Sequence, residues 1–112
     1  MMRLCAVLVF LWSSCPLIVR AEPVLQWSVG FHRLNFLDPL DHQPMHAIAF
    51  YPSTAKEGSS RLGSYQVDAT ENAKIASGHY PLLMLSHGNT GTPLALHDMA
   101  TALARKGFVV VA

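Results

Sequence analysis

Five consecutive residues, His87-Gly88-Asn89-Thr90-Gly91, have the types and the spacing to do chemistry. They follow an apolar run at 82–85 and precede a pattern typical of a helix start. A glycine-rich loop in this position presents backbone N–H groups that no side chain shields. Such groups can stabilise the negative charge that develops on a carbonyl oxygen during acyl transfer. The segment therefore predicts an oxyanion-binding loop.

The other parts of such a site are not recognisable in the chain. Ser86 and His87 are neighbours, but adjacent residues on a strand point to opposite faces and cannot pair as nucleophile and base. Asp68 and Asp98 lie in no motif that would place them in a catalytic triad, so we expect both to be structural. We expect the nucleophile, the general base and the acid outside this chain.

Six histidines raise the question of metal binding. His42 and His46 have the i, i+4 spacing of helical metal ligands, but Pro44 between them argues against a helix. The chain has no HExxH motif and no compact cluster of metal ligands. We expect no metal site and no cofactor.

The elements around the loop predict a right-handed strand–helix–strand unit. The runs 82–85 and 108–111 are apolar on both faces, as in parallel strands that helices cover on both sides. Thr92 can cap the helix, Pro93 suits its first position and Gly107 ends it. An apolar stripe is expected at Leu96, Met99, Ala100 and Leu103. The opposite, solvated face is expected to carry His97, Thr101 and Arg105.

Upstream of this unit, the pattern predicts an antiparallel strand pair. Residues 27–37 alternate like a half-buried strand, with a β-bulge near Gly30 where the pattern slips. Residues 38–44 have turn chemistry, and a second strand at 45–51 is expected to stop at Pro52. The polar stretch 53–79 is predicted as a long surface excursion with one short strand around 65–67.

The first 21 residues have the order of a secretory signal peptide. A positive charge at Arg3 precedes the apolar run 4–12, and small residues stand at Val19 and Ala21. We expect cleavage after Ala21 and a secreted or periplasmic protein with no stable membrane span. An uncleaved anchor, or a lipid on Cys15, is the alternative.

The composition of the mature chain argues against disulfide bonds and against nucleic acid as a partner. Both cysteines, Cys5 and Cys15, lie in the expected signal, so the core alone must hold the exported protein together. The formal net charge is +1, and it becomes −1 once Arg3 and Arg20 are removed. No basic run is present, so nucleic acid is not an expected partner.

The segment 85–92 resembles the HGxxG oxyanion loop of α/β-hydrolases, and its surroundings are similar to their secreted dienelactone-hydrolase-like and platelet-activating-factor-acetylhydrolase-like branch. The resemblance also includes Phe50-Tyr51-Pro52 and the run 107–112. It implies that the Asn89 backbone N–H is the oxyanion donor, supported by His87, Gly88 and Gly91. The Asn89 side-chain amide is the alternative donor.

The resemblance implies an α/β fold, with residues 22–112 as the N-terminal portion of an α/β-hydrolase domain that is incomplete at its C-terminal end. The implied activity is that of an exported serine-type hydrolase of ester or lactone bonds, acting on a small-molecule ester or lipid-like substrate. A Cys nucleophile is also open, and the 112 residues alone are expected to be inactive. The alternative is a non-catalytic exported binding or scaffold protein with the same topology.

Overall fold

The computed structural model describes residues 25–89 and 91–112. The expected signal peptide at 1–21, with both cysteines, lies outside the described residues. The elements in chain order are β1 (Ser28–Leu37), β2 (Pro44–Ser53), β3 (Ser60–Leu62), β4 (Tyr65–Val67), β5 (Thr70–Glu71), β6 (Leu82–Met84), the 3-10 helix η1 (Pro93–Leu96), α1 (His97–Arg105) and β7 (Val109–Val111).

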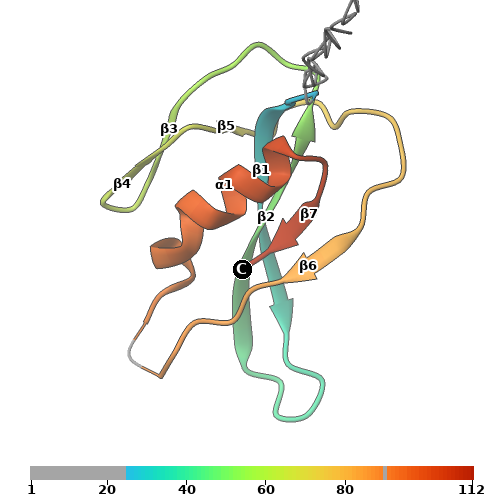
Figure 1. The fold of residues 1–112 in the computed structure, drawn as a ribbon. Helices are drawn as coiled ribbons and strands as arrows, with labels where there is room; N and C mark the ends of the chain where they lie inside the picture. The colour runs from blue at the N-terminus through green and yellow to red at the C-terminus, as the bar shows by residue number, and fades with distance from the viewer. Residues whose placement is uncertain (1–24, 90) are drawn as a thin grey trace, which may run out of the picture.

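A five-stranded sheet organises the chain, in the order β5-β1-β2-β7-β6 (Figure 1). Strands β1 and β2 pair antiparallel, and β2 pairs antiparallel with β7. Strands β6 and β7 are parallel, and α1 connects them. The predicted antiparallel pair and the predicted strand–helix–strand unit are therefore both confirmed.

The predicted bulge near Gly30 is wrong. The register of β1 and β2 runs without interruption from Ser28 opposite Ser53 to Leu37 opposite Pro44. Gly30 breaks the hydrophobic pattern for another reason, because the ring of Tyr51 lies across it. A Cβ atom at Gly30 would stand 2.9 Å from Tyr51 Cζ, inside any normal contact distance.

The sequence predicted that Pro52 ends the second strand. This prediction is wrong, because Pro52 lies inside β2. The carbonyl oxygen of Pro52 accepts a hydrogen bond of 2.9 Å from the Ala76 N–H. The ladder on that side is short, with a single bridge between Ser53 and Ile75. Pro52 lies beyond the residues of β2 that pair with β7, Ala49 and Phe50, so its missing N–H does not interrupt that ladder.

The hairpin turn between β1 and β2 has the chemistry that the sequence predicted. The Asp38 carboxylate accepts a hydrogen bond of 2.7 Å from the Leu40 N–H, and Asp41 accepts one of 3.0 Å from Gln43. His42 adopts a φ of 57° in this turn. This left-handed backbone conformation is uncommon for a residue other than glycine and occurs mostly in turns.

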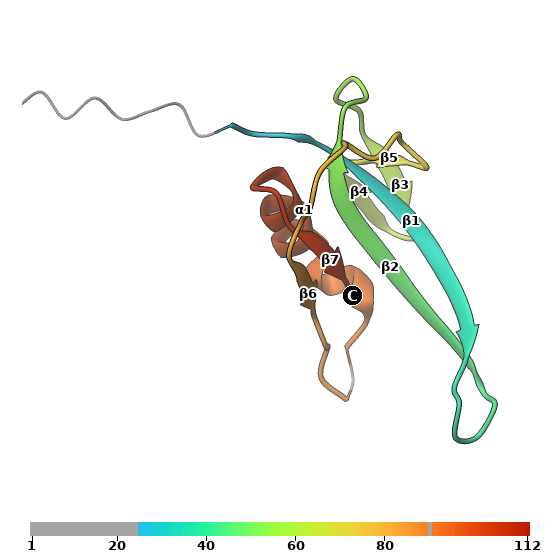
Figure 2. The same cartoon turned by 90° about the vertical axis from the view of Figure 1, so that its right-hand side faces the viewer.

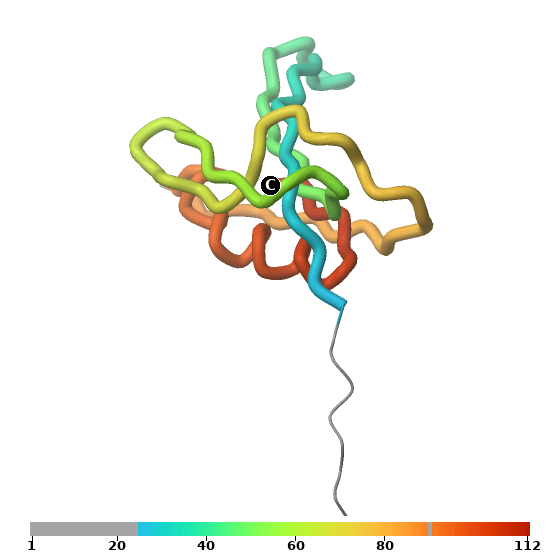
Figure 3. Tube along the Cα trace, turned by 90° about the horizontal axis from the view of Figure 1, so that it is seen from above, coloured from blue at the N-terminus to red at the C-terminus, as the bar shows by residue number. Residues whose placement is uncertain are grey.

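The polar stretch after β2 holds more structure than the single predicted strand. Strands β3 and β4 form a separate antiparallel hairpin, and β5 adds a short parallel edge to β1. This hairpin lies beside the start of α1 (Figure 3), where the Tyr65 and His97 rings are 4.9 Å apart. Buried Leu62 and Val67 join it to the main core.

The buried face of the helix differs in part from the one predicted, although Ala100 is buried and Leu103 is partly buried as expected. Its buried residues are His97, Ala100, Thr101 and Ala104. Met99, which was expected on the apolar stripe, is exposed, and His97, which was expected in solvent, is only 9% exposed. The first turn winds as a 3-10 helix, which rotates the following residues relative to a continuous α-helix.

Helix α1 covers only one face of the sheet (Figure 2). Phe31, Phe50 and Val110 pack beneath it with no exposure above 1%. On the opposite face of β6, Leu82 and Met84 are 61% and 70% exposed. Among the described residues, cover on one face of this strand is therefore confirmed, and cover on the other face stays a prediction. No helix among residues 25–89 and 91–112 combines the length and the apolar character needed to cross a membrane.

Candidate active site

The predicted loop leaves the sheet at the carboxyl end of β6. The Leu85 N–H donates a hydrogen bond of 2.8 Å to the Val111 carbonyl, so the pairing with β7 continues one residue past β6. The chain then departs at Ser86 and re-enters regular structure at Pro93. In open α/β sheets, ligands bind outside the carboxyl ends of the parallel strands. The loop 87–91 follows the carboxyl end of β6, so it lies where ligands bind in such sheets.

A tight turn shapes the loop. The Gly91 N–H donates a hydrogen bond of 2.8 Å to the Gly88 carbonyl, which closes a four-residue turn with Asn89 in its second position. The same carbonyl lies 2.9 Å from His87 Nδ1. Because a carbonyl oxygen only accepts, His87 Nδ1 is the donor. The His87 side chain therefore stabilises the turn by a hydrogen bond to the carbonyl of the next residue, Gly88.

The two glycines of the loop have different surroundings. A Cβ atom at Gly91 would stand 3.2 Å from both the Gly88 oxygen and the His87 Cβ atom, so this position is crowded by the turn itself. Among the described residues, a Cβ atom at Gly88 would meet nothing within 4 Å. Within this part of the chain, packing therefore explains glycine at Gly91 but not at Gly88.

The turn also determines which N–H groups remain available. The Gly91 N–H is used by the Gly88 carbonyl. Among residues 25–89 and 91–112, no hydrogen-bond partner is found for the Asn89 N–H, and Asn89 is exposed. Its backbone N–H is therefore free to donate to a ligand.

A groove of about 250 Å³ lies against the loop. Ser86 and His87 line it on the loop side. Its other walls come from the hairpin, from the ends of β6 and β7, and from η1: Phe36, Met45, His46, Ala47, Met84, Leu85, Pro93, Val111 and Ala112. Most of these residues are apolar, so the groove offers an apolar surface beside the start of the loop, at Ser86 and His87.

The remaining titratable candidates lie apart from the groove. Asp98 Oδ1 is 3.0 Å from His97 Nδ1, yet within the described residues this nitrogen has no partner of hydrogen-bond geometry. Asp68 contributes its backbone carbonyl to Arg105 Nη2, at 3.4 Å. No group of three or more metal-ligating side chains is found in the described part of the chain.

The hairpin register brings together two side chains that sequence reasoning did not combine. Asn35 on β1 stands opposite His46 on β2, and Asn35 Oδ1 lies 2.6 Å from His46 Nδ1. Both are exposed beside the loop region. The length of the turn was the only available signal, because it determines which residues face each other across a hairpin.

Comparison with protein families gives one match. Residues 49–112, more than half of the chain, match the family described as platelet-activating factor acetylhydrolase, isoform II. The chain belongs to this family. The match includes the loop and both parallel strands, so the α/β-hydrolase resemblance that the sequence indicated is confirmed. Comparison with curated individual proteins gave no match.

A solved structure extends the comparison to the fold. The chain is similar to a ferulic acid esterase from Streptomyces cinnamoneus, with a TM-score of 0.68 and 21% sequence identity. The similarity covers 82% of this chain and 34% of that one, so the chain spans about a third of the length of the esterase. The fold is therefore that of one part of an α/β-hydrolase, as predicted.

Proposed function

We propose that the protein is an ester hydrolase in which the loop 87–91 binds the oxyanion. The observation that carries this proposal is the free, exposed Asn89 N–H at the carboxyl end of β6, in a chain of an acetylhydrolase family. A preorganised N–H stabilises the charge on the carbonyl oxygen in the transition state without reorganising. His87 and Gly91 hold the turn that presents this N–H.

The rest of the mechanism needs groups outside residues 1–112, a proposal in keeping with the chain's span of about a third of the similar esterase. A Ser or Cys nucleophile attacks the carbonyl carbon, a histidine takes its proton, and an acidic residue orients that histidine. The second oxyanion donor in this fold is the N–H after the nucleophile. The substrate class is an ester or lactone of a small or lipid-like molecule.

Export is a second part of the proposal, and residues 1–21 support it by their charged, apolar and small-residue order. The mature chain then begins at Glu22. The intact mass of the exported protein tests this directly. A product that retains Met1, or one that carries a lipid on Cys15, would contradict cleavage after Ala21.

The activity is tested on the full-length protein with 4-nitrophenyl acetate and with a short lactone. We expect turnover clearly above a heat-treated control, and covalent labelling of one residue by an ester-mimetic phosphonate. Absence of both in a folded protein would contradict hydrolysis and favour a binding or scaffold role for the same topology.

A further inference from the structure

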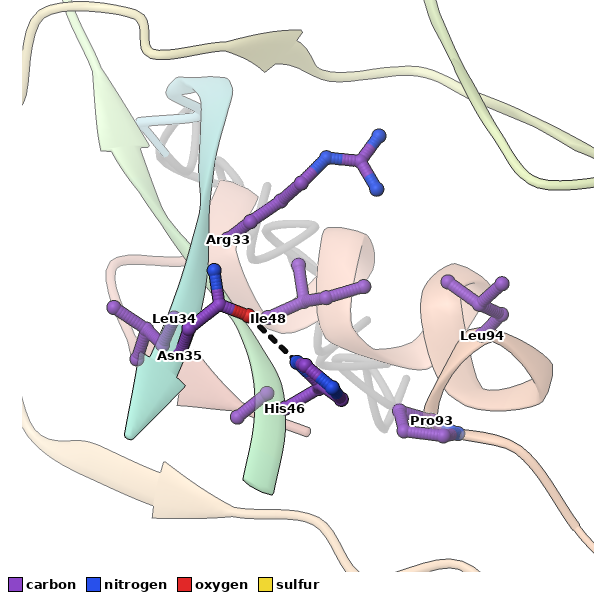
Figure 4. Close-up of a pocket in the computed structure, with 8 residues that line it drawn as sticks. Arg33, Leu34, Asn35, His46, Ile48, Pro93 and Leu94 are labelled. Atoms are coloured by element: carbon purple, nitrogen blue, oxygen red, sulfur yellow. Dashed lines mark hydrogen bonds between the residues drawn. The ribbon is translucent and has the colours of Figure 1, made fainter. Parts of the chain in front are cut away.

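A second pocket, of about 180 Å³, opens between the β1–β2 hairpin and η1 (Figure 4). It lies on the face of the sheet that α1 covers. Its walls include Arg33, Asn35, His46, Ile48, Pro93 and Leu94. His46 and Pro93 also line the groove beside the loop, so the two cavities share a wall. The pocket is therefore adjacent to the groove.

The Asn35–His46 pair gives the pocket a defined hydrogen-bonding pattern. Asn35 Oδ1 only accepts, so His46 Nδ1 carries the proton of their 2.6 Å hydrogen bond. In the neutral imidazole, Nε2 is then an acceptor, and the Asn35 amide nitrogen remains a donor. The pair thus offers one acceptor and one donor from adjacent side chains.

Charge argues against an anion in this pocket. Arg33, the cation among its lining residues, forms an ion pair of 2.7 Å through Nε with the Glu71 carboxylate. This partner compensates the guanidinium charge. A neutral group that both donates and accepts a hydrogen bond fits better, and a hydroxyl group is the simplest such group.

The volume of the pocket and its remaining lining residues indicate what the rest of the ligand would be like. Ile48, which lies beside the polar pair on β2, and Pro93 and Leu94 on η1 supply apolar surface. A dry cavity of about 150 Å³ accommodates a benzene ring, so about 180 Å³ has room for one ring with a substituent. The pocket is therefore matched to a compact apolar group that carries a hydroxyl.

We propose that this pocket is a substrate subsite that recognises a hydroxyl-bearing ring or similarly compact group, with His46 as the specificity-determining residue and Asn35 as its positioning residue. The assignment of the ligand as substrate rests on the proposed hydrolase function. The assignment of the pocket as a binding site does not depend on it.

Binding is tested first, without catalysis, by titrating the full-length protein with phenol and with benzene and following backbone amide NMR shifts. We expect phenol to bind about 3–10-fold more tightly, the scale of one net hydrogen bond, with shifts around His46 and Leu94. His46→Ala and Asn35→Ala should each reduce this preference towards unity. His32→Ala is the matched control, because His32 is an exposed histidine on the opposite face of β1.

Hydrolysis is tested next with paired substrates. Benzyl acetate and 4-hydroxybenzyl acetate place the hydroxyl in the alcohol part, and methyl phenylacetate with its 4-hydroxy analogue places it in the acid part. One pair should show a kcat/KM preference of about 3–10-fold that His46→Ala removes and His32→Ala keeps. That pair identifies which part of the ester occupies the subsite.

The outcomes separate the two proposals. A phenol preference that depends on His46 in a protein without hydrolysis would support the binding site and refute the proposed function. Equal binding of phenol and benzene, or a preference unchanged in both folded variants, would overturn the subsite. Hydrolysis with no hydroxyl preference in either pair would leave the proposed function standing and refute the subsite as a substrate site.

Discussion

At the scale of single residues, close contacts decide where this chain requires glycine. Gly30 and Gly91 are both crowded, the first by the Tyr51 ring and the second by the turn of the loop. Gly88 is not crowded. Glycine in this chain therefore meets a packing constraint at Gly30 and Gly91 but not at Gly88, and substitutions can distinguish these positions.

Gly30→Ala is expected to destabilise the protein. The added Cβ atom would stand 2.9 Å from Tyr51 Cζ and 3.0 Å from Ala73 Cβ, so the buried Tyr51 ring would have to shift. Overpacking of this kind costs about 1–3 kcal/mol. Urea unfolding measures the change. Gly88→Ala is the control, and an equal loss in both variants would contradict this explanation.

The stability of the folded protein should depend on pH through Tyr51, and the direction of this dependence follows from the burial of its side chain. Burial raises the pKa of Tyr51 above its ordinary value of 10.0, and its hydroxyl donates to the Ala73 carbonyl at 3.0 Å. The folded state favours the protonated phenol more than the unfolded state does. The stabilisation is therefore complete below pH 10 and is lost as the pH rises through the folded pKa.

Tyr51→Phe should remove this dependence. We expect the free energy of unfolding of the wild type to fall more steeply than that of Tyr51→Phe between pH 9 and pH 11, as measured by urea unfolding at each pH. Tyr80→Phe is the control, since Tyr80 is only half-buried. Parallel curves for the wild type and Tyr51→Phe would contradict the assignment.

At the scale of elements, the start of the helix connects the loop to the core. Thr92 Oγ1 accepts a hydrogen bond of 3.3 Å from the Leu94 N–H, and Pro93 follows as the first residue of η1. Capping by threonine satisfies a backbone donor that the helix leaves unpaired. The cap also defines where the loop ends.

Thr92→Ala is expected to lower stability by about 1 kcal/mol, within the range of measured N-cap substitutions. Thr92→Ser keeps the hydroxyl and should stay within a few tenths of the wild type. Thermal and urea unfolding of both variants provide the measurement. Equal losses would show that the Thr92 methyl group, and not its hydroxyl, matters.

Local patterns predicted the elements well and their tertiary environment poorly. The alternation in β1, the turn chemistry of Asp38 and the cap at Thr92 are encoded within a few residues, so they could be read from the sequence. The burial of His97 could not, because it depends on the distant β3–β4 hairpin that places Tyr65 against it. For the same reason, the Asn35–His46 pair could be recognised only once the register of the β1–β2 hairpin was known.

At the scale of the whole molecule, the open face of the sheet is the main feature. Leu82, Met84 and Ile75 are exposed on the face opposite α1. In sheets of parallel strands both faces are normally covered. The sequence pattern predicted the element type and the parallel pairing correctly here. It could not show the exposure, because a strand's own residues do not reveal what lies on each side of it.

Residues 22–112 expressed alone should self-associate and lack esterase activity. Exposed apolar patches drive association, so a double variant with Leu82→Lys and Met84→Lys should be more monomeric in sedimentation velocity. Leu40→Lys is the control, because Leu40 is 91% exposed at the hairpin turn, away from this face. A monomeric wild-type piece, or ester turnover above a heat-treated control, would contradict this prediction.

The central claim is that the Asn89 N–H, and not its side chain, stabilises the oxyanion. Asn89 stands at the second position of the turn, where proline is favoured in common turn types. Asn89→Pro therefore removes the N–H while suiting the turn, and Asn89→Ala removes only the side chain. Both variants are made in the full-length protein and checked by thermal melting.

The measurement is kcat for an activated ester in these two variants. We predict that Asn89→Pro lowers kcat by roughly 10²–10³, or about 2.7–4 kcal/mol, the usual loss for one oxyanion donor. Asn89→Ala should remain close to the wild type. If Asn89→Ala loses activity on that scale while folded Asn89→Pro keeps it, the backbone N–H is not the donor and the assignment of the loop is wrong.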